Sequence, residues 1–147
     1  MLSQLNVRAA SREDIDSIIA LDPFAQQDLR RRAFIAYAVT AGQCLVAVEP
    51  EDASALLGYG VLNKSFFEND FVPVIVVKVS ARRRGVATAI MTALESQCSG
   101  KLFSSTNASN VAMRQLLTRL GFVESGQIEN LDENDPELVF VKLRPSF

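Results

Sequence analysis

The segment best suited to chemistry runs from Val77 to Thr88, where a strand-like run leads through a short basic turn into an amphipathic helix that begins with small residues. The start of a helix presents N–H groups without partners and a partial positive charge, and a glycine there lets an anion approach the main chain closely. The arginines at positions 82–84 precede Gly85 and add attraction for a polyanion. These residue types predict a site for a diphosphate held mainly by main-chain amides.

Two familiar phosphate-binding patterns are missing from this turn. Its spacing matches neither GxxxxGKS nor GxGxxG, which disfavours an NTPase loop and a dinucleotide fingerprint. A structural alternative also exists, in which the turn is a solvated basic loop and Gly85 eases close packing of the helix on the sheet. The residues by themselves leave both interpretations open.

Histidine is absent from all 147 residues. Its absence excludes Ser-His-Asp and Cys-His hydrolase mechanisms and most zinc enzymes, so no metal site is expected. Cys44 and Cys98 stand in apolar or helical patterns without a CxxC spacing. We therefore expect both cysteines to be buried, reduced thiols.

The composition is that of one globular domain, which we expect to span residues 1–147. The chain has 15 basic and 17 acidic side chains, a net charge of -2 and 48% hydrophobic residues, and such a slightly acidic chain is not expected to bind nucleic acid. The longest apolar stretch, Phe71 to Val79, contains Pro73 and Lys78 and is far shorter than the roughly 20 residues of a membrane helix. Because the first residues also lack a basic start and an apolar core, we expect a cytoplasmic protein without a membrane segment.

The elements that must position the basic turn alternate between strand and helix, which predicts a single mixed α/β domain. Phe71–Val79 is rich in β-branched residues without polar alternation, so we expect it near the middle of a sheet with both faces buried. The three arginines at 30–32 are expected to form a solvated basic helix face. The predicted strands are Asn6–Ala9, Gln43–Glu49, Ala55–Leu62, Phe71–Val79, Lys101–Ser105, Phe122–Ile128 and Leu138–Leu143, and the predicted helices are Ser11–Asp22, Gln26–Thr40, Gly85–Cys98 and Asn110–Leu120.

Two matches make the sequence resemble the GCN5-related N-acetyltransferase (GNAT) superfamily. The acetyl-CoA signature of that family is Arg or Gln, two residues, Gly, one residue, then Gly or Ala, and Arg82, Gly85 and Ala87 meet it after a strand. A later segment of the family has an Asn opening a helix that ends in Gly-Phe, which Asn110 and Gly121-Phe122 match at the family's spacing. With the order of strands and helices, the resemblance covers nearly the whole chain.

The resemblance implies a GNAT-like mixed sheet of about six to seven mostly antiparallel strands with about four helices, in which Phe71–Val79 and Lys101–Ser105 splay apart to form a slot. It implies acetyl-CoA as cosubstrate and direct acetyl transfer to a primary amine of a small-molecule or peptide acceptor. A main-chain N–H near Val77 would stabilise the oxyanion, and Asn110 would bind the pantetheine arm from the opposite wall. The implied cofactor-binding residues are Ile75, Val77, Val79, Arg82, Arg83, Arg84, Gly85, Val86, Ala87, Thr88 and Asn110.

The catalytic groups of the family are only partly matched. Leu117 stands where many members carry a Tyr that protonates the departing thiolate, and Phe71 stands where some members carry a Glu base. Leu117 also completes an apolar helical stripe, which predicts a core residue. Glu68 and Asp70, in the loop before the central strand, are the nearest acidic candidates for a general base, with solvated loop charges as the alternative.

Two further groups bear on the mechanism. Water, or one of the hydroxyls of Ser104, Ser105 and Thr106, could take the place of the missing Tyr. An acidic group on the closing hairpin would favour a cationic amine, although a solvated turn explains it equally well; it consists of Glu129, Asp132, Glu133 and Asp135.

Two hypotheses of different kinds follow. The first is an acetyltransferase that works through a ternary complex without a covalent intermediate, because neither cysteine lies in the signature segments. The second is a CoA-binding module or regulatory pseudo-enzyme without turnover, which the missing Tyr suggests. Under either hypothesis we expect a monomer or a homodimer, and the identity of the amine acceptor stays open.

Overall fold

The computed structural model describes residues 5–143 of the chain. These residues divide by their internal contacts into two compact units. The first unit holds the chain up to Leu62 together with Val74–Leu94, and the second holds Asn63–Pro73 and the chain from Glu95 onward. Each unit has its own strands and at least one helix.

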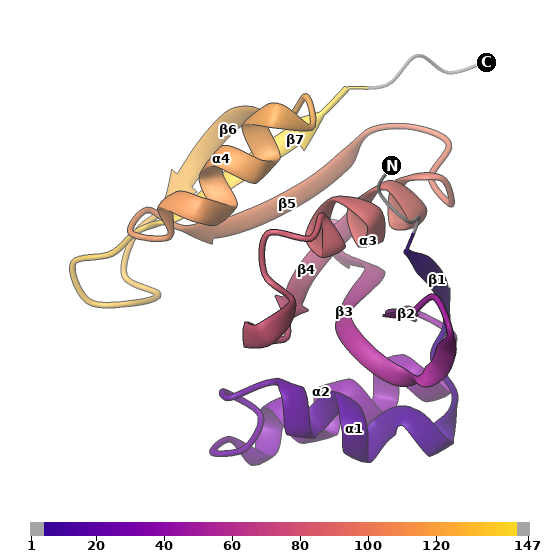
Figure 1. Cartoon of the computed structure of the whole chain (residues 1–147). Helices are drawn as coiled ribbons and strands as arrows, with labels where there is room; N and C mark the ends of the chain where they lie inside the picture. Colours follow the sequence, from indigo (N-terminus) through magenta and orange to yellow (C-terminus); the bar gives the residue numbers. More distant parts are fainter. Residues whose placement is uncertain (1–4, 144–147) are drawn as a thin grey trace. The chain divides into compact units, whose positions relative to one another are not determined.

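The strands and helices follow one another in the predicted order, although two helices and then three strands are consecutive, so strict alternation is not seen (Figure 1). The described residues form a seven-stranded sheet in the order β1-β2-β3-β4-β5-β7-β6. The pairs β1–β2, β2–β3, β5–β7 and β6–β7 are antiparallel, whereas β4–β5 is parallel, which confirms the mixed, mostly antiparallel sheet. The strands are β1 (Asn6–Ala9), β2 (Cys44–Glu49), β3 (Asp52–Phe66), β4 (Asn69–Val77), β5 (Leu102–Asn107), β6 (Val123–Ile128) and β7 (Glu137–Lys142), and the helices are α1 (Ile15–Leu21), α2 (Leu29–Thr40), α3 (Val86–Glu95) and α4 (Val111–Arg119), with short 3-10 turns η1 (Arg12–Asp14) and η2 (Val79–Ala81).

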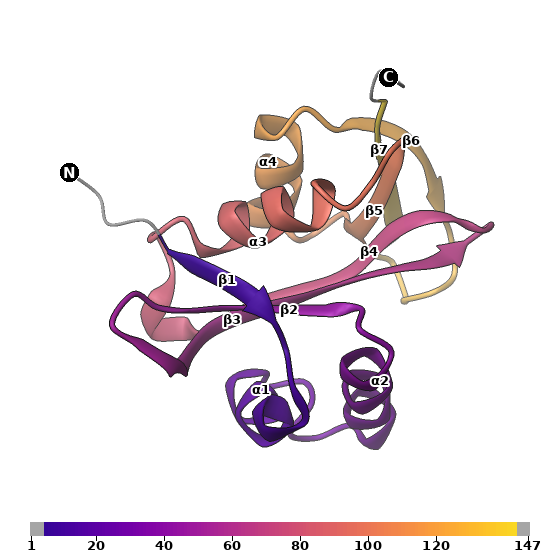
Figure 2. The same cartoon turned by 90° about the vertical axis from the view of Figure 1, so that its right-hand side faces the viewer.

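In the first unit, α1 and α2 cover one side of β1–β3 and α3 lies on the other side (Figure 2). The core under α1 and α2 contains Ile18 and Ile35 from the helices and Val46 and Tyr59 from the strands, all of them fully buried. Alternation along β3 sends Tyr59 toward this core and its neighbours toward α3. The central strands of the first unit are therefore covered by helices on both sides.

Two glycines of β3 allow α3 to lie close to the sheet. A Cβ atom added to Gly60 would lie 2.6 Å from Cγ2 of Ile90, and one added to Gly58 would lie 2.7 Å from the carbonyl oxygen of Val76 and 3.0 Å from Cγ1 of Val86. Real Cβ atoms do not approach other heavy atoms this closely, so no side chain fits at either position. These glycines set how near the start of α3 lies to the strands.

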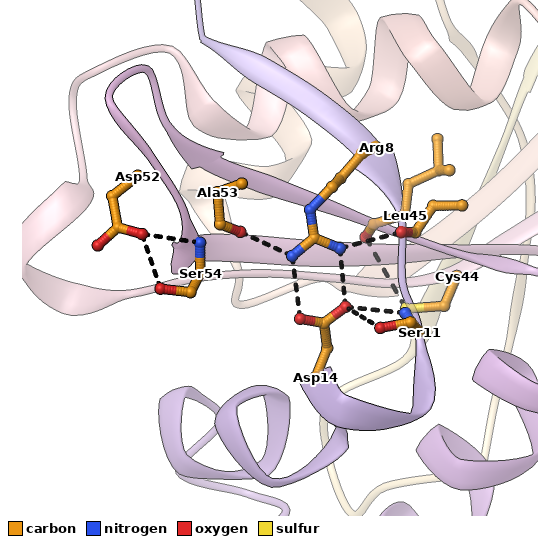
Figure 3. Close-up of polar contacts among 9 residues, drawn as sticks. Arg8, Ser11, Asp14, Cys44, Leu45, Asp52, Ala53 and Ser54 are labelled. Atoms are coloured by element: carbon orange, nitrogen blue, oxygen red, sulfur yellow. Dashed lines mark hydrogen bonds and ion pairs between the residues drawn. The ribbon is translucent and has the colours of Figure 1, made fainter.

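Arg8 ties the first strand to the segment that enters α1 (Figure 3). Its guanidinium donates to both carboxylate oxygens of Asp14, at 2.8 and 3.0 Å, and to the carbonyl oxygen of Ala53 at 2.7 Å. The amide of Ser11 also donates to Asp14, at 2.8 Å. The hydrogen bonds from Arg8 are the largest cause that lowers the pKa of Asp14, which falls to about 2, and the amide of Ser11 adds to the effect.

The solvated basic face expected at positions 30–32 is largely wrong. Arg31 donates from Nη1 to Oδ2 of Asp22 at 2.9 Å, and Arg32 donates from Nε to the carbonyl oxygen of Ala25 at 2.7 Å. Only Arg30 matches the expectation, with 94% of its side chain exposed. The reason is that Asp22 is only 2% exposed, and a buried carboxylate needs a charged partner.

The second unit has its own core under α4. Leu117 is fully buried, which confirms its prediction as a core residue, and Leu116 of α4 and Leu138 and Phe140 of β7 are buried as well. Leu116 and Leu117 are the buried residues of α4, as the helical spacing of its leucines predicts. A Tyr at position 117 would therefore be a core residue in this chain.

Several predicted boundaries were wrong, each for a local reason. Helix α2 begins at Leu29, not at Gln26, because the side chain of Asp28 caps its first amides. Strand β3 continues to Phe66, because it forms a hairpin with β4 through two left-handed turn residues, Phe67 and Glu68. The predicted first helix starts as the 3-10 turn η1, so α1 itself begins only at Ile15. The remaining ends match the prediction or differ by up to three residues, which is normal for helix and strand termini.

The prediction for the central strand was also only partly right. Strand β4 is fourth in the strand order, as expected, but only Val72 of its residues is buried and Val74–Val77 are half-buried. The cysteines behave as expected, since Cys44 and Cys98 are both buried and reduced. Within residues 5–143, no helix is long and apolar enough to cross a membrane, and no cluster of acidic and cysteine side chains could hold a metal ion.

Candidate functional site

The basic turn forms an exposed loop between two buried anchors in the first unit. Ala81 ends η2 and is 1% exposed, and Val86 begins α3 and is 2% exposed. The residues between these anchors, Arg82–Gly85, are all exposed. The core therefore holds both ends of the loop while its middle faces solvent.

Two left-handed residues shape this loop. Arg83 has φ 68° and Gly85 has φ 78°. Turns with such residues direct successive N–H groups into a concavity that binds anions. The amide of Ala89 donates to the carbonyl oxygen of Gly85 at 3.0 Å and begins the hydrogen bonding of α3, so the amides of the preceding turn have no acceptor inside the helix. This geometry suits the diphosphate that the sequence predicts.

Arg84 is held by an acidic residue of a distant strand. Its Nη2 donates to Oε1 of Glu49 at 2.8 Å, and its Nη1 donates to Oε2 at 3.2 Å. The hydrogen bonds from Arg84 hold the pKa of Glu49 below its usual value and raise the pKa of Arg84. Sequence reasoning missed Glu49, because nothing in the residues around it marks a partner 35 positions away.

The strand that leads into the loop ends earlier than predicted. Strand β4 stops at Val77, the amide of Lys78 donates to the carbonyl oxygen of Leu57 at 2.8 Å, and Val79 lies in η2 with 64% of its surface exposed. Val79 is therefore not a strand residue, whereas Ile75 and Val77 are.

Pairing between β4 and β5 is short. It consists of Phe71 with Phe103 and Val72 with Ser104, and the register ends there. Val74–Val77 continue β4 beyond this register and are half-buried. A strand segment of this kind can pair with an extended ligand whose own amides need partners.

Asn110 lies in the second unit, at the start of α4. Its Oδ1 accepts a hydrogen bond from the amide of Met113 at 3.1 Å, so the side chain caps the helix. Because the carbonyl end of the side-chain amide is used in this way, its NH₂ group remains as the donor for a ligand. The residue is exposed.

The two candidate bases lie in the second unit. Glu68 is in the turn between β3 and β4, whereas Asp70, predicted in the same loop, is the second residue of β4, because that strand begins two residues earlier than predicted. Asp70 forms an ion pair with Lys64, whose Nζ donates to Oδ1 of Asp70 at 3.0 Å. The side chain of Asp70 is 18% exposed. Glu68 is exposed in the turn at φ 64°. A ring cluster lies beside them, in which Phe66 is 5.3 Å from Phe71 between ring centroids.

Two hydroxyls considered as replacements for the Tyr already donate elsewhere. Ser104 Oγ donates to the carbonyl oxygen of Val72 at 2.9 Å, and Ser105 Oγ donates to Oε2 of Glu137 at 2.7 Å. Thr106 is buried, with 7% of its surface exposed. The hydroxyl protons of Ser104 and Ser105 are therefore engaged within the structure.

Part of the acidic hairpin braces the loop that carries Asn110. Asp135 accepts from the amide and the hydroxyl of Ser109, at 3.0 and 2.6 Å, and Asp132 accepts from Nδ2 of Asn107 at 2.8 Å. These two carboxylates therefore have a structural role, which the sequence did not indicate.

Comparisons with known proteins agree with this geometry. Residues 12–122 match the model of the acetyltransferase (GNAT) family. A GNAT-family acetyltransferase from Bacillus cereus is 36% identical over 97% of this chain and 100% of its own, with a TM-score of 0.86. No curated protein matches the chain.

More distant structures share the fold. The Ard1 protein of Thermoplasma volcanium is 18% identical over 97% of this chain and 99% of its own, with a TM-score of 0.82. A putative streptothricin acetyltransferase from Bacillus anthracis, solved with acetyl coenzyme A, is 17% identical over 69% of this chain and 61% of its own, with a TM-score of 0.60.

Together, the loop between β4 and α3, the mixed sheet and the family match define an acyltransferase of the GNAT class. The chain belongs to the GNAT acetyltransferase family. It transfers an acetyl group from acetyl-CoA to an amine acceptor, and the family resemblance inferred from Arg82, Gly85, Ala87 and Asn110 is confirmed.

Proposed function

We propose that the loop Arg82–Thr88 holds the diphosphate of acetyl-CoA through its main-chain amides. The observation that carries this assignment is the pair of left-handed residues, Arg83 and Gly85, directly before the free amides of α3. A phosphate oxygen approaches the main chain most closely at Gly85, which has no side chain. Arg82 and Arg83 are exposed beside it and add positive charge.

The pantetheine arm lies along Ile75–Val77 as an added strand. The support is the register of β4, which leaves these residues unpaired with β5, and their half-buried state. The Nδ2 group of Asn110 is assigned to the same arm on the strength of the family resemblance and of its capping geometry, which leaves that group as a donor.

Acetyl transfer then proceeds by direct attack. The amine nitrogen adds to the thioester carbonyl carbon, and the negative charge that forms on the oxygen is stabilised by the main-chain N–H of Val77. The carbon–sulfur bond breaks, the nitrogen gives its extra proton to water, and the acetyl group stays on nitrogen as an amide. CoA leaves as a thiolate that takes a proton from water, so the net transfer of one proton is from nitrogen to sulfur.

Before attack, the ammonium form of the acceptor must lose a proton, because only the neutral amine has a lone pair. We assign this step to Glu68 or Asp70, acting through water. Glu68 is exposed, and Asp70 is partly covered and paired with Lys64. The variants Glu68→Gln and Asp70→Asn distinguish the two candidates, because the pH dependence of kcat/KM changes only in the variant that lacks the base.

The acceptor class follows from the reaction. We assign a primary amine on a small molecule or peptide, acetylated by a single-domain, cytoplasmic monomer or homodimer that binds no nucleic acid. The net charge of -2 supports the lack of nucleic-acid binding, because such binders carry an excess of basic side chains.

The test has two stages. Calorimetric titration with CoA measures binding, and thiol release from acetyl-CoA with a panel of amines measures turnover. The proposal requires CoA binding that Gly85→Glu removes and thiol release that depends on an added amine. Tight binding with no release from any amine would favour the CoA-binding module, and no binding would overturn the site.

A further inference from the structure

The three arginines of the phosphate loop are not equivalent. Arg84 makes two hydrogen bonds to Glu49, at 2.8 and 3.2 Å. The side chains of Arg82 and Arg83 are exposed and have no hydrogen-bond or ion-pair partner among residues 5–143. One arginine is therefore held in place, while the other two are available to an anionic ligand.

Glu49 lies next to a buried segment of the first unit. It is the last residue of β2, and the residues before it, Cys44–Val48, are all buried. Its own side chain is 29% exposed, compared with 39% for that of Arg84. The ion pair thus joins the end of a core strand to the middle of an exposed loop.

The position of Arg84 within the loop is important. It lies between Arg83 and Gly85, the two left-handed residues. A left-handed conformation is unfavourable for a residue with a side chain, so Arg83 keeps it only while the surrounding structure holds it. A two-point contact at Arg84 restrains the main chain on both sides, because an Arg–carboxylate fork has a fixed geometry.

A restrained loop binds its ligand better than a mobile one, because less conformational entropy is lost on binding. The pair has a second effect, since the positive charge of Arg84 neutralises a carboxylate that would otherwise repel the diphosphate. An alternative is that Arg84 releases Glu49 when CoA binds and contacts a phosphate itself, in which case removing Glu49 would strengthen CoA binding. If Glu49 instead holds the loop in place, removing it weakens CoA binding, so the two possibilities predict opposite changes in affinity.

We propose that Glu49 is a positioning residue for acetyl-CoA, which acts through Arg84 to hold the phosphate loop in its binding conformation. This inference rests on the proposed function of the loop. Arg84 on this view is a structural member of the loop, and Arg82 and Arg83 supply the charge that meets the ligand. Glu49 touches neither substrate, so its loss changes binding and not the chemical step.

The key variant is Glu49→Gln, and Glu51→Gln is its matched control. Glu51 lies two positions further along in the exposed turn between β2 and β3 and makes no side-chain hydrogen bond within residues 5–143. Both substitutions remove one negative charge from the same side of the loop, so their difference isolates the ion pair. Arg84→Gln and the double variant Glu49→Gln/Arg84→Gln complete the set.

Calorimetry with CoA and steady-state kinetics with acetyl-CoA give the readouts. We expect Glu49→Gln to raise the Kd for CoA and the KM for acetyl-CoA about two- to five-fold, the range of an exposed ion pair, with kcat unchanged. Glu51→Gln should leave both constants unchanged or slightly lower. The double variant should bind CoA no more weakly than Arg84→Gln alone, because both substitutions remove the same contact.

The outcomes are distinct. If Glu49→Gln binds CoA as well as Glu51→Gln does, or more tightly, the positioning role is overturned while the proposed function stands. A fall in kcat at unchanged KM would also overturn it, since a positioning role acts on binding. If the wild-type chain binds no CoA, the proposed function fails and this inference fails with it. Unchanged circular dichroism spectra for all variants confirm that each is folded.

Discussion

Asp14 provides a direct test of how the first unit is held together. Its carboxylate accepts two hydrogen bonds from Arg8 and one from the amide of Ser11, as Figure 3 shows. The side chain of Asp14 is 9% exposed and that of Arg8 is 34% exposed, so the pair is partly shielded from water. Asp14→Asn removes the charge while keeping the shape of the side chain.

The size of the effect follows from the pKa. Folding lowers the pKa of Asp14 from 3.8 to about 2, which corresponds to about 2 kcal/mol of stability at neutral pH. Because the folded pKa is the lower one, this stability is present in full above the unfolded value of 3.8 and is lost as the pH falls toward 2. At neutral pH, Asp14→Asn should therefore lower the free energy of unfolding by about 2 kcal/mol.

Urea denaturation between pH 2 and pH 7 measures both quantities. The wild-type chain should lose stability steeply below about pH 4, and Asp14→Asn should show a shallower loss over the same range. Asp16→Asn, at an exposed carboxyl two residues further along, is the control and should follow the wild-type curve. The reasoning is refuted if Asp14→Asn and the wild-type chain lose the same free energy between pH 5 and pH 2.

Three further substitutions test the coenzyme site and the packing behind it. Gly85→Glu should reduce CoA affinity at least about 100-fold, because a carboxylate would face the diphosphate. Its control, Gly85→Ala, carries the same left-handed strain without the charge and should bind CoA more tightly than Gly85→Glu does. Equal affinities of the two variants in calorimetry would contradict the assignment. Asn110→Ser keeps a capping oxygen and should leave thermal stability within about 0.5 kcal/mol while weakening CoA binding several-fold, and an unchanged Kd would remove Asn110 from the site. Gly60→Ala should destabilise the fold by about 1–3 kcal/mol in urea, because its Cβ would lie 2.6 Å from Ile90, whereas Gly100→Ala, with open space around it, should not.

The sequence predicted most of the fold because the relevant signals are local. The apolar spacing of α4 predicts both its existence and the burial of Leu117. The run of β-branched residues before the basic turn predicts β4, although its last two predicted residues belong to η2 or precede it. Burial of β4 was overestimated, because an apolar run does not reveal where its pairing with β5 ends.

Prediction of the candidate site was similarly divided. The loop Arg82–Gly85 could be proposed from residue types and spacing, because a tight turn before a helix depends on a few neighbouring residues. Asn110 could be predicted from its neighbours only as the start of a helix, and its assignment to the site came from the family resemblance. The partner of Arg84 could not, and neither could the bracing of Ser109 by Asp135. Both contacts join residues that only strand pairing and loop packing bring close.

By itself, the sequence determined the order of the strands and helices, the positions of the glycine and arginines in the loop proposed to bind phosphate, and the reactions that the lack of histidine excludes. The tertiary structure decided which charges are used: Asp22 takes Arg31, Asp14 takes Arg8, and Glu49 takes Arg84. The physical reason is range. Main-chain conformation responds to residues a few positions away, whereas a side chain acquires its partner only after distant strands have been placed in register.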